Sequence, residues 1–232
     1  MKDAVIVSTA RSPIGLAFKG TLNNIKSPTL TAHAIRHAVD RAGVGGEEID
    51  DVIIGAVLTA GTAGMNIGRL ASLAAGLPNT VSGQTIDRQC SSGLMAIATA
   101  AKQIIVDGMD IVVAGGQDNI SAVQNQYFPW VADQADPNVV MHAEHAYMPM
   151  LLTAEHVVKQ YDITREAQDE YALQSQMRTA AGQQSGAFDD EIVPISATRA
   201  IKDKESGEIS YSDAVQEKDE GNRPQTTLEG LG

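Results

Sequence analysis

The strongest constraint on the fold is an alternation of short apolar runs with helical segments in the first half of the chain. The runs are rich in β-branched residues and bounded by turn residues, which predicts buried strands. Glycines stop the helical segments at Gly43, Gly76 and Gly108. The predicted strands are 4–8, 49–57, 81–86 and 110–114, and the predicted helices are 27–42, 66–75 and 94–106. This alternation predicts an α/β fold whose sheet has helices on both faces. Ser27 is the expected cap of the first helix.

The pattern changes after about residue 119. Residues 127–150 hold Trp130, three prolines and two histidines without a clear period, which predicts irregular structure. Two helices should follow, and Thr164 is placed to cap the second. The remaining expectations are helices over 153–161 and 164–185, a candidate strand over 192–195 and a solvated turn at 202–208. We therefore expect two domains, an α/β core over residues 1–119 and a helical, loop-rich domain over 120–232.

The charge balance limits the partners that this chain can have. Its 232 residues include 17 Lys and Arg against 29 Asp and Glu, for a net charge of −12. An acidic surface disfavours nucleic acid and anionic membrane as main partners. No apolar stretch reaches the roughly 18 residues that a membrane span needs, and the first residues do not have the layout of a secretory signal. These features predict a cytoplasmic protein with no nucleic-acid and no membrane partner.

Cys90 is the only cysteine, and it stands between the predicted strand 81–86 and the predicted helix 94–106. A single cysteine in a cytosolic protein is often a small, buried, inert side chain. Its polar neighbours from Arg88 to Ser92 favour a different environment. A thiol at the start of a helix meets the positive end of the helix dipole, which favours the reactive thiolate. Cys90 is therefore a candidate nucleophile for covalent catalysis.

Two histidine pairs are the remaining candidates for metal binding. His142 and His145 lie three residues apart, and His33 and His37 lie four apart. Neither pair is accompanied by the third ligand that a zinc site requires. We therefore expect no metal site.

Four groups of residues, in order along the chain, resemble the N-terminal half of the thiolases, the enzymes that cleave or form 3-ketoacyl-CoA. They are AVIVSTARSPIG from residue 4, DRQCSSGL from residue 87, AGGQDNIS from residue 114, and the group MLLTAE, REAQD and EIVP from residues 150, 165 and 191. The resemblance covers essentially the whole chain. It implies a thiolase-like N-terminal core with a mixed sheet, an inserted helical loop domain, and the absence of the family's C-terminal half.

The resemblance also implies a chemistry. Cys90 would attack the 3-keto carbon of an acyl-CoA, acetyl-CoA would leave as its enolate, and a second CoA would take the acyl group. Arg223 matches an arginine near the CoA nucleotide, although a solvated surface arginine is an equal alternative, and Met150 is expected on the substrate side. Coenzyme A and acyl-CoA would be substrates, with no further cofactor. A homo-oligomer, dimer or tetramer, is implied.

Several groups that the family uses do not occur in this sequence. They are a histidine in a Gly-His-Pro string, a second cysteine and an asparagine in an Asn-Glu-Ala-Phe-type string. A helix-like start at 226–229 lies just before the end of the sequence, so we expect a truncated chain. Without the missing groups we expect little or no turnover. Without the second half of the family's core we expect exposed apolar surface, with dimerisation or poor solubility. The alternatives are a non-catalytic thiolase-fold protein that binds acyl-CoA or a partner, and a condensing ketoacyl synthase, which the loop-domain match disfavours.

Overall fold

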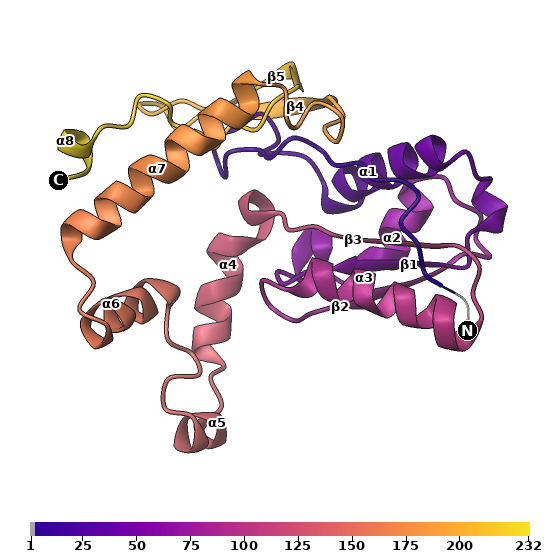
Figure 1. Ribbon diagram of the computed structural model, residues 1–232, viewed down its shortest axis with the longest axis horizontal. Coiled ribbons are helices and arrows are strands. Elements are labelled where there is room, and N and C mark those ends of the chain that lie inside the picture. The colour runs from indigo at the N-terminus through magenta and orange to yellow at the C-terminus, as the bar shows by residue number, and fades with distance from the viewer. Residues whose placement is uncertain (1–2) are drawn as a thin grey trace. The chain divides into compact units, whose positions relative to one another are not determined.

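The computed structural model describes residues 3–232, which form two compact units (Figure 1). The first unit contains the chain up to Tyr127 together with Glu191–Glu220, and the second contains Phe128–Asp190 and Gly221–Gly232. The units differ from the expected partition at residue 119 because residues 191–220 pack with the first part of the chain. The division into domains at 1–119 and 120–232 stays a prediction.

A three-stranded parallel sheet forms the centre of the first unit, in the order β2-β1-β3. The strands are β1 (Asp51–Gly55), β2 (Ser82–Ile86) and β3 (Val112–Gly116). All five residues of β1 are buried, as expected for a strand with neighbours on both edges. Three of the four predicted strands are therefore confirmed.

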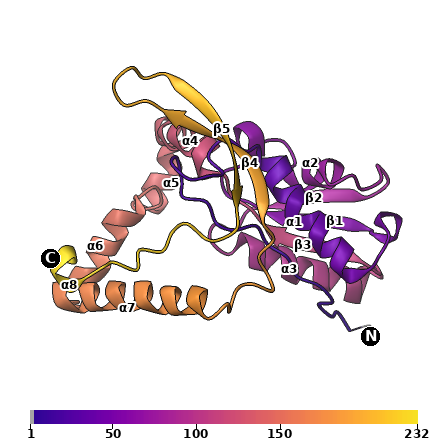
Figure 2. The same ribbon diagram turned by 90° about the horizontal axis from the view of Figure 1, so that it is seen from above.

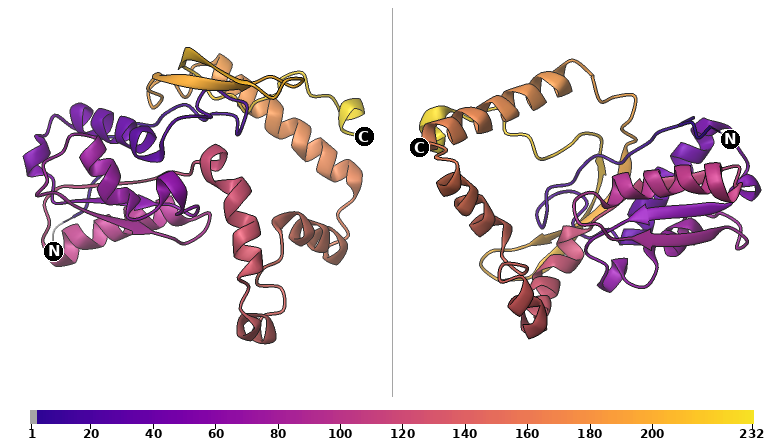
Figure 3. Two further views of the ribbon diagram at one scale, coloured as in Figure 1. Left: turned by 180° about the vertical axis from the view of Figure 1, so that it is seen from behind. Right: turned by 60° about the horizontal axis from the view of Figure 1, so that its bottom comes forward.

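Helices cover both faces of this sheet. Val52 and Ile54 of β1 pack in one cluster with residues of α1 (Ser27–Ala42) and α2 (Ile67–Ala74). Ile53, which points to the opposite face, packs against Ala96 and Ala100 of α3 (Ser92–Lys102). Figure 1 and the right view of Figure 3 show α3 along one side of the strands. The predicted α/β fold and its three helices are confirmed.

The predicted strand at residues 4–8 is wrong. Val5, Ile6 and Val7 are 72%, 75% and 73% exposed and belong to no strand. An apolar run becomes a strand only when another strand completes its hydrogen-bond ladder, and none does so among residues 3–232. The run instead lines a cavity of about 790 Å³, together with residues of α1, α3 and β3.

The predicted cap at Ser27 is also wrong, because Lys26 occupies the N-cap position and Ser27 is the first helical residue. Its hydroxyl is buried and has no hydrogen-bond partner among residues 3–232.

Residues 191–220 return to the first unit as a hairpin. Strands β4 (Ile195–Lys202) and β5 (Ile209–Gln216) pair antiparallel, as Figure 2 shows. The turn predicted at 202–208 lies at its tip. The candidate strand 192–195 differs from β4, which begins only at Ile195. The sequence does not predict β5, because five of its first six residues are exposed and show no alternation of buried residues.

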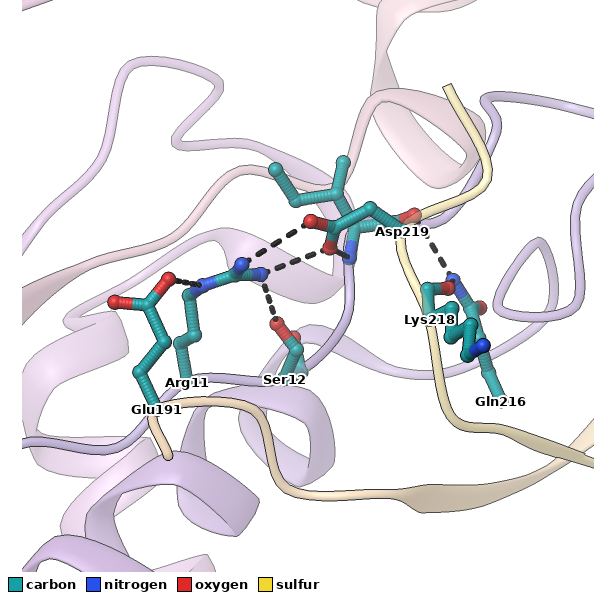
Figure 4. Close-up of polar contacts among 7 residues, drawn as sticks. Arg11, Ser12, Glu191, Gln216, Lys218 and Asp219 are labelled. Carbon is teal, nitrogen blue, oxygen red and sulfur yellow. Dashed lines mark hydrogen bonds and ion pairs between the residues drawn. The ribbon is translucent and has the colours of Figure 1, made fainter. Parts of the chain in front are cut away.

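A polar network joins this returning segment to residues 11–21 (Figure 4). Arg11 donates through Nε to Glu191 Oε1 at 2.8 Å and through Nη1 and Nη2 to the carboxylate of Asp219 at 2.8 and 3.1 Å. Asp219 also accepts from the backbone N of Ile14 at 2.7 Å. Burial raises the pKa of Asp219, but these hydrogen bonds and the charge of Arg11 outweigh it, so the net pKa is lowered.

Glu220 extends the network. It accepts from Leu16 N at 2.8 Å and from the hydroxyl of Thr21 at 2.6 Å. The pKa of Glu220 is likewise lowered, because these hydrogen bonds exceed the effect of burial.

Helices dominate the second unit. Helix α4 (Ile120–Asp133) leads into it, and α5 (Pro137–His142), α6 (Met150–Gln160), α7 (Arg165–Gln184) and α8 (Leu228–Leu231) follow. The irregular structure predicted for 127–150 is therefore wrong over the end of α4 and over α5, and is confirmed over 134–136 and 143–149. Pro137 opens α5 at a position that proline suits, and Pro129 lies inside α4. The predicted cap of α7 is confirmed, since the Thr164 side chain accepts from Ala167 N at 3.2 Å. Figure 2 shows α8 beside the first turn of α7.

Candidate active site around Cys90

Cys90 is exposed on the turn that connects β2 to α3. The alternative of a small buried cysteine therefore does not hold. The thiol is accessible to a molecule from solution, which a nucleophile requires.

Hydrogen bonds on both sides of Cys90 fix the backbone of this turn. The buried hydroxyl of Ser92 accepts from Arg88 N at 2.8 Å and donates to Gln89 O at 2.6 Å. The carboxylate of Asp87 accepts from Gln89 N at 2.9 Å. Gln89 has a φ of +48°, in the left-handed region that non-glycine residues rarely adopt. Such a conformation persists only where the surroundings hold it, so the fold fixes the backbone of the turn and with it the direction of the Cα–Cβ bond of Cys90.

Three glycines bring the start of α3 against the ends of two strands. We call Gly55, Gly93 and Gly116 the glycine seat. A Cβ added to Gly55 would lie 2.2 Å from the carbonyl carbon of Ser92, and one added to Gly116 would lie 3.0 Å from the Cα of Gly93. Only glycine permits backbone to approach backbone this closely. The residues after Cys90 are therefore seated on the ends of β1 and β3, with no room for a side chain at Gly55, a tight fit at Gly116 and ordinary contact distances for a Cβ at Gly93.

Asp118 organises the neighbouring loops. Its Oδ1 atom accepts from Val57 N at 3.2 Å and from Leu58 N at 2.9 Å, so it ties the loop after β3 to the loop after β1. Together with the turn at Cys90, these loops follow the carboxyl ends of all three parallel strands. In α/β folds, ligands bind at this edge of the sheet.

The other two predicted site residues lie in the second unit. Met150 opens α6 and is 75% exposed. Arg223 is exposed, and its backbone N donates to Gln176 Oε1 of α7 at 2.7 Å. The structure thus distributes the three residues over two units, with Cys90 in the first and Met150 and Arg223 in the second.

Two other kinds of feature are absent from residues 3–232. Within residues 3–232, no three His, Cys, Asp or Glu side chains are grouped so that they could hold a metal ion. In the same part of the chain, no helix is long and apolar enough to cross a membrane. His142 ends α5, and His145 lies in the turn beyond it, so the two histidines do not share one helix face.

Sequence reasoning missed the residues that support the site. Ser92 acts through hydrogen bonds to backbone atoms three and four residues before it, whereas Asp118 and Gln176 act through hydrogen bonds to backbone atoms distant in the sequence. The string Ser91-Ser92-Gly93 after the cysteine was a signal for the first of them, because serine side chains often close turns at helix starts. Nothing local in the sequence marks Asp118 or Gln176.

Comparison with known proteins agrees with the resemblance in the sequence. Residues 4–232 match the family described as thiolase, N-terminal domain. The chain is 45% identical to an acetyl-CoA acetyltransferase of Cupriavidus necator over 84% of its own length and 51% of that protein. It is 40% identical to a 3-ketoacyl-CoA thiolase of Bacillus subtilis over its whole length and 58% of the relative.

A solved structure gives the same result. The crystal structure of an acetyl-CoA acetyltransferase from Bacillus anthracis superposes with a TM-score of 0.80 at 38% identity, over 99% of this chain and 57% of the other. The chain therefore spans about half the length of the relatives it matches. By the family match, the sequence identity and the shared fold, the chain belongs to the thiolase family, and residues 4–232 correspond to its N-terminal domain.

Proposed function

We propose that this chain carries the nucleophile of a thiolase-type acyl-CoA C-acetyltransferase, and that Cys90 is the residue that accepts the acyl group. The observation that supports this most directly is the placement of an exposed thiol on a turn that the glycine seat and Ser92 hold in one geometry. A fixed nucleophile loses less freedom when it meets its substrate, which is one source of catalytic rate.

The proposed reaction proceeds through two acyl transfers. The Cys90 sulfur bonds to the C3 carbon of a 3-ketoacyl-CoA, and the bond between C2 and C3 breaks. The electron pair stays on C2 of the departing acetyl-CoA, which then takes a proton. The thiol of a second CoA attacks the thioester on Cys90 and releases the shortened acyl-CoA, which restores the cysteine. The reverse sequence forms the bond between two acyl groups.

Arg223 and Met150 would serve substrate binding. A guanidinium can stack on an adenine ring or pair with phosphate, so Arg223 is suited to the nucleotide end of CoA. Met150 is an apolar, flexible side chain and is suited to contact the pantetheine or acyl portion. Acyl-CoA and CoA are the proposed partners, in a homo-oligomer in the cytoplasm, without a metal, further cofactor, nucleic acid or membrane partner.

We also propose that the 232-residue chain alone turns over slowly. Cleavage to an enolate needs an acid and base and a stabiliser for the developing negative charge. Within residues 3–232, no histidine is hydrogen-bonded to Cys90. This favours a chain in which Cys90 still takes an acetyl group from acetyl-CoA, a transfer that releases CoA and forms no enolate, whereas cleavage of a 3-ketoacyl-CoA is slow. A chain that binds acyl-CoA without any transfer is the second candidate.

Intact-mass spectrometry after incubation with a 3-ketoacyl-CoA or acetyl-CoA tests both parts. With acetyl-CoA we expect an acetyl adduct on the unchanged chain and none on Cys90→Ala; with a 3-ketoacyl-CoA we expect little adduct and little sustained CoA-dependent cleavage in a coupled assay. Iodoacetamide should alkylate Cys90 at neutral pH faster than it alkylates free cysteine. No adduct, with alkylation as slow as that of free cysteine, would support the non-catalytic candidate. Normal turnover would contradict the proposal that the chain alone is impaired.

A further inference from the structure

The segment that contains Arg223 is attached to α7 through one side chain. Gln176, in the second half of α7, accepts two hydrogen bonds from the Asn222 side chain, at 2.9 Å through its backbone O and at 3.0 Å through Oε1. The same Oε1 atom accepts from the backbone N of Arg223 at 2.7 Å. Asn222 and Gln176 are both half-buried, so these contacts are partly shielded from water.

The other side of Arg223 is fixed as well. Its carbonyl oxygen accepts from Thr226 N at 3.1 Å and from the Thr226 hydroxyl at 2.7 Å. Pro224 follows and restricts the backbone of the residue before it to extended conformations. Both peptide groups of Arg223 are therefore held in place.

The guanidinium groups of Arg223 and Arg165 differ in their hydrogen-bond and ion-pair partners. Arg165 at the start of α7 pairs with Asp169 at 2.9 Å and also donates to the Leu231 carbonyl. The Arg223 guanidinium, in contrast, makes no hydrogen bond or ion pair with any other part of residues 3–232 that the structure describes. The contacts thus fix the backbone and present an exposed cation to solvent.

We propose that Gln176 is a positioning residue for Arg223, which holds the arginine where it can meet the nucleotide end of CoA. The inference rests on the proposed function, in which Arg223 contacts CoA. Gln176 itself touches no substrate. By ordering the 221–226 segment before CoA binds, Gln176 reduces the conformational entropy that binding costs. The affinity of the chain for CoA therefore rises through Arg223.

Calorimetric titration of the whole chain with CoA tests this inference. Gln176→Met keeps the size of the side chain and removes the acceptor. We expect about threefold to tenfold weaker CoA binding, as the loss of a hydrogen-bonded anchor predicts. Gln174→Met, an exposed glutamine on the same helix, is the matched control and should bind like the unchanged chain. Pantetheine lacks the nucleotide, so its binding should be the same in all three proteins.

The double variant separates positioning from a general structural role. Arg223→Ala should weaken CoA binding, and Gln176→Met should then add no further loss, because its effect passes through the arginine. Effects that add, equal loss of pantetheine binding, or normal CoA binding by Gln176→Met would overturn the inference. If Gln176→Met lowers the helix content, Asn222→Ala is the substitute variant. It removes the hydrogen bonds that the Asn222 side chain donates to Gln176 and leaves α7 unchanged.

Two other outcomes would contradict the proposed function and not only the role of Gln176. CoA binding that is unchanged in Arg223→Ala would show that Arg223 has no part in recognition. Absence of CoA binding by the unchanged chain would contradict the proposed function itself, and the role of Gln176 with it.

Discussion

The turn at Cys90 and the segment at Arg223 both present one side chain from a fixed backbone, but they fix it by different means. At Cys90, backbone packs on backbone through the glycine seat, and a buried hydroxyl closes the turn. At Arg223, one glutamine side chain and one threonine hold an exposed segment through hydrogen bonds. The first arrangement leaves no room for an added atom at Gly55, whereas the second can exchange its contacts with water. Substitutions should therefore have larger effects in the first region.

The largest effect should follow Gly55→Ala. The new Cβ would lie 2.2 Å from Ser92 backbone, so the start of α3 must move away from the sheet. We expect the free energy of unfolding to fall by about 3 kcal/mol and the alkylation of Cys90 by iodoacetamide to slow. Urea unfolding and the alkylation rate measure the two effects.

Gly115→Ala is the matched control for that substitution. An added Cβ at Gly115 meets nothing within 4 Å, so stability and alkylation should change little. Equal losses in both variants would mean that the glycine seat does not fix the turn.

The stability contributed by Asp219 and Glu220 should fall at low pH, whereas that contributed by the glycine seat should not. The pKa values of Asp219 and Glu220 lie below their ordinary values of 3.8 and 4.5 in the folded protein. Their contribution to stability is therefore complete above the unfolded pKa values and is lost as the pH falls through the folded ones. Removing both charges, with Asp219→Asn and Glu220→Gln, should lower the free energy of unfolding by about 2 kcal/mol at pH 7.

The same double variant should also lose less stability than the unchanged chain between pH 7 and pH 3.5, as urea unfolding at each pH would show. Glu205→Gln, in the exposed hairpin turn, serves as the control and should leave the pH dependence unaltered. An unchanged pH dependence in the double variant would exclude these two carboxylates as its cause.

A smaller effect is expected for Ser92→Ala. Its hydroxyl is buried and bridges Arg88 N and Gln89 O, so removal leaves one donor and one acceptor without this partner. We expect about 1–2 kcal/mol less stability and slower alkylation of Cys90. Ser91→Ala removes an exposed hydroxyl from the same turn and should have less than half that effect on stability. A larger loss of stability in Ser91→Ala than in Ser92→Ala would mean that Ser91 holds the turn.

The smallest effect should come from Thr164→Ala at the start of α7. Loss of the cap to Ala167 N predicts about 1 kcal/mol of destabilisation by thermal unfolding. Alkylation of Cys90 should be unaffected, because the cap belongs to the second unit. Thr179→Ala, an exposed position inside α7, should be nearly neutral, and a larger loss there would contradict the capping role of Thr164.

Prediction from the sequence succeeded where burial and helix ends produce local patterns. The strands at 49–57, 81–86 and 110–114 are in place. The stops at Gly43, Gly76 and Gly108 are in place too, the last after a π-helical turn, Gln103–Asp107, that continues α3, and each glycine has the positive φ that a helix end requires. Cys90 could be singled out because its polar neighbours are adjacent in sequence.

The failures share a different cause. Residues 4–8 have the composition of a strand, but their state depends on a distant partner that the described residues do not supply. Strand β5 is largely exposed, so no alternation of buried residues marks it. The prolines of 127–150 predict irregular structure, but Pro137 opens α5, because proline is also favoured in the first turn of a helix. Contacts such as Gln176 to Arg223 span 47 residues and have no local signature.

The network at Arg11 also sets an order of events during synthesis. Its partners Glu191 and Asp219 lie 180 and 208 residues further along the chain. At ribosomal rates of about 5–20 residues per second, Arg11 waits roughly 10–40 s for Asp219 to be made. During that time the first unit has its parallel sheet but lacks the hairpin and the carboxylates that fasten residues 11–21. The nascent chain is therefore exposed to mispairing over this interval, and residues 11–21 are among the last parts of the first unit to settle although they are made before most of the rest of that unit.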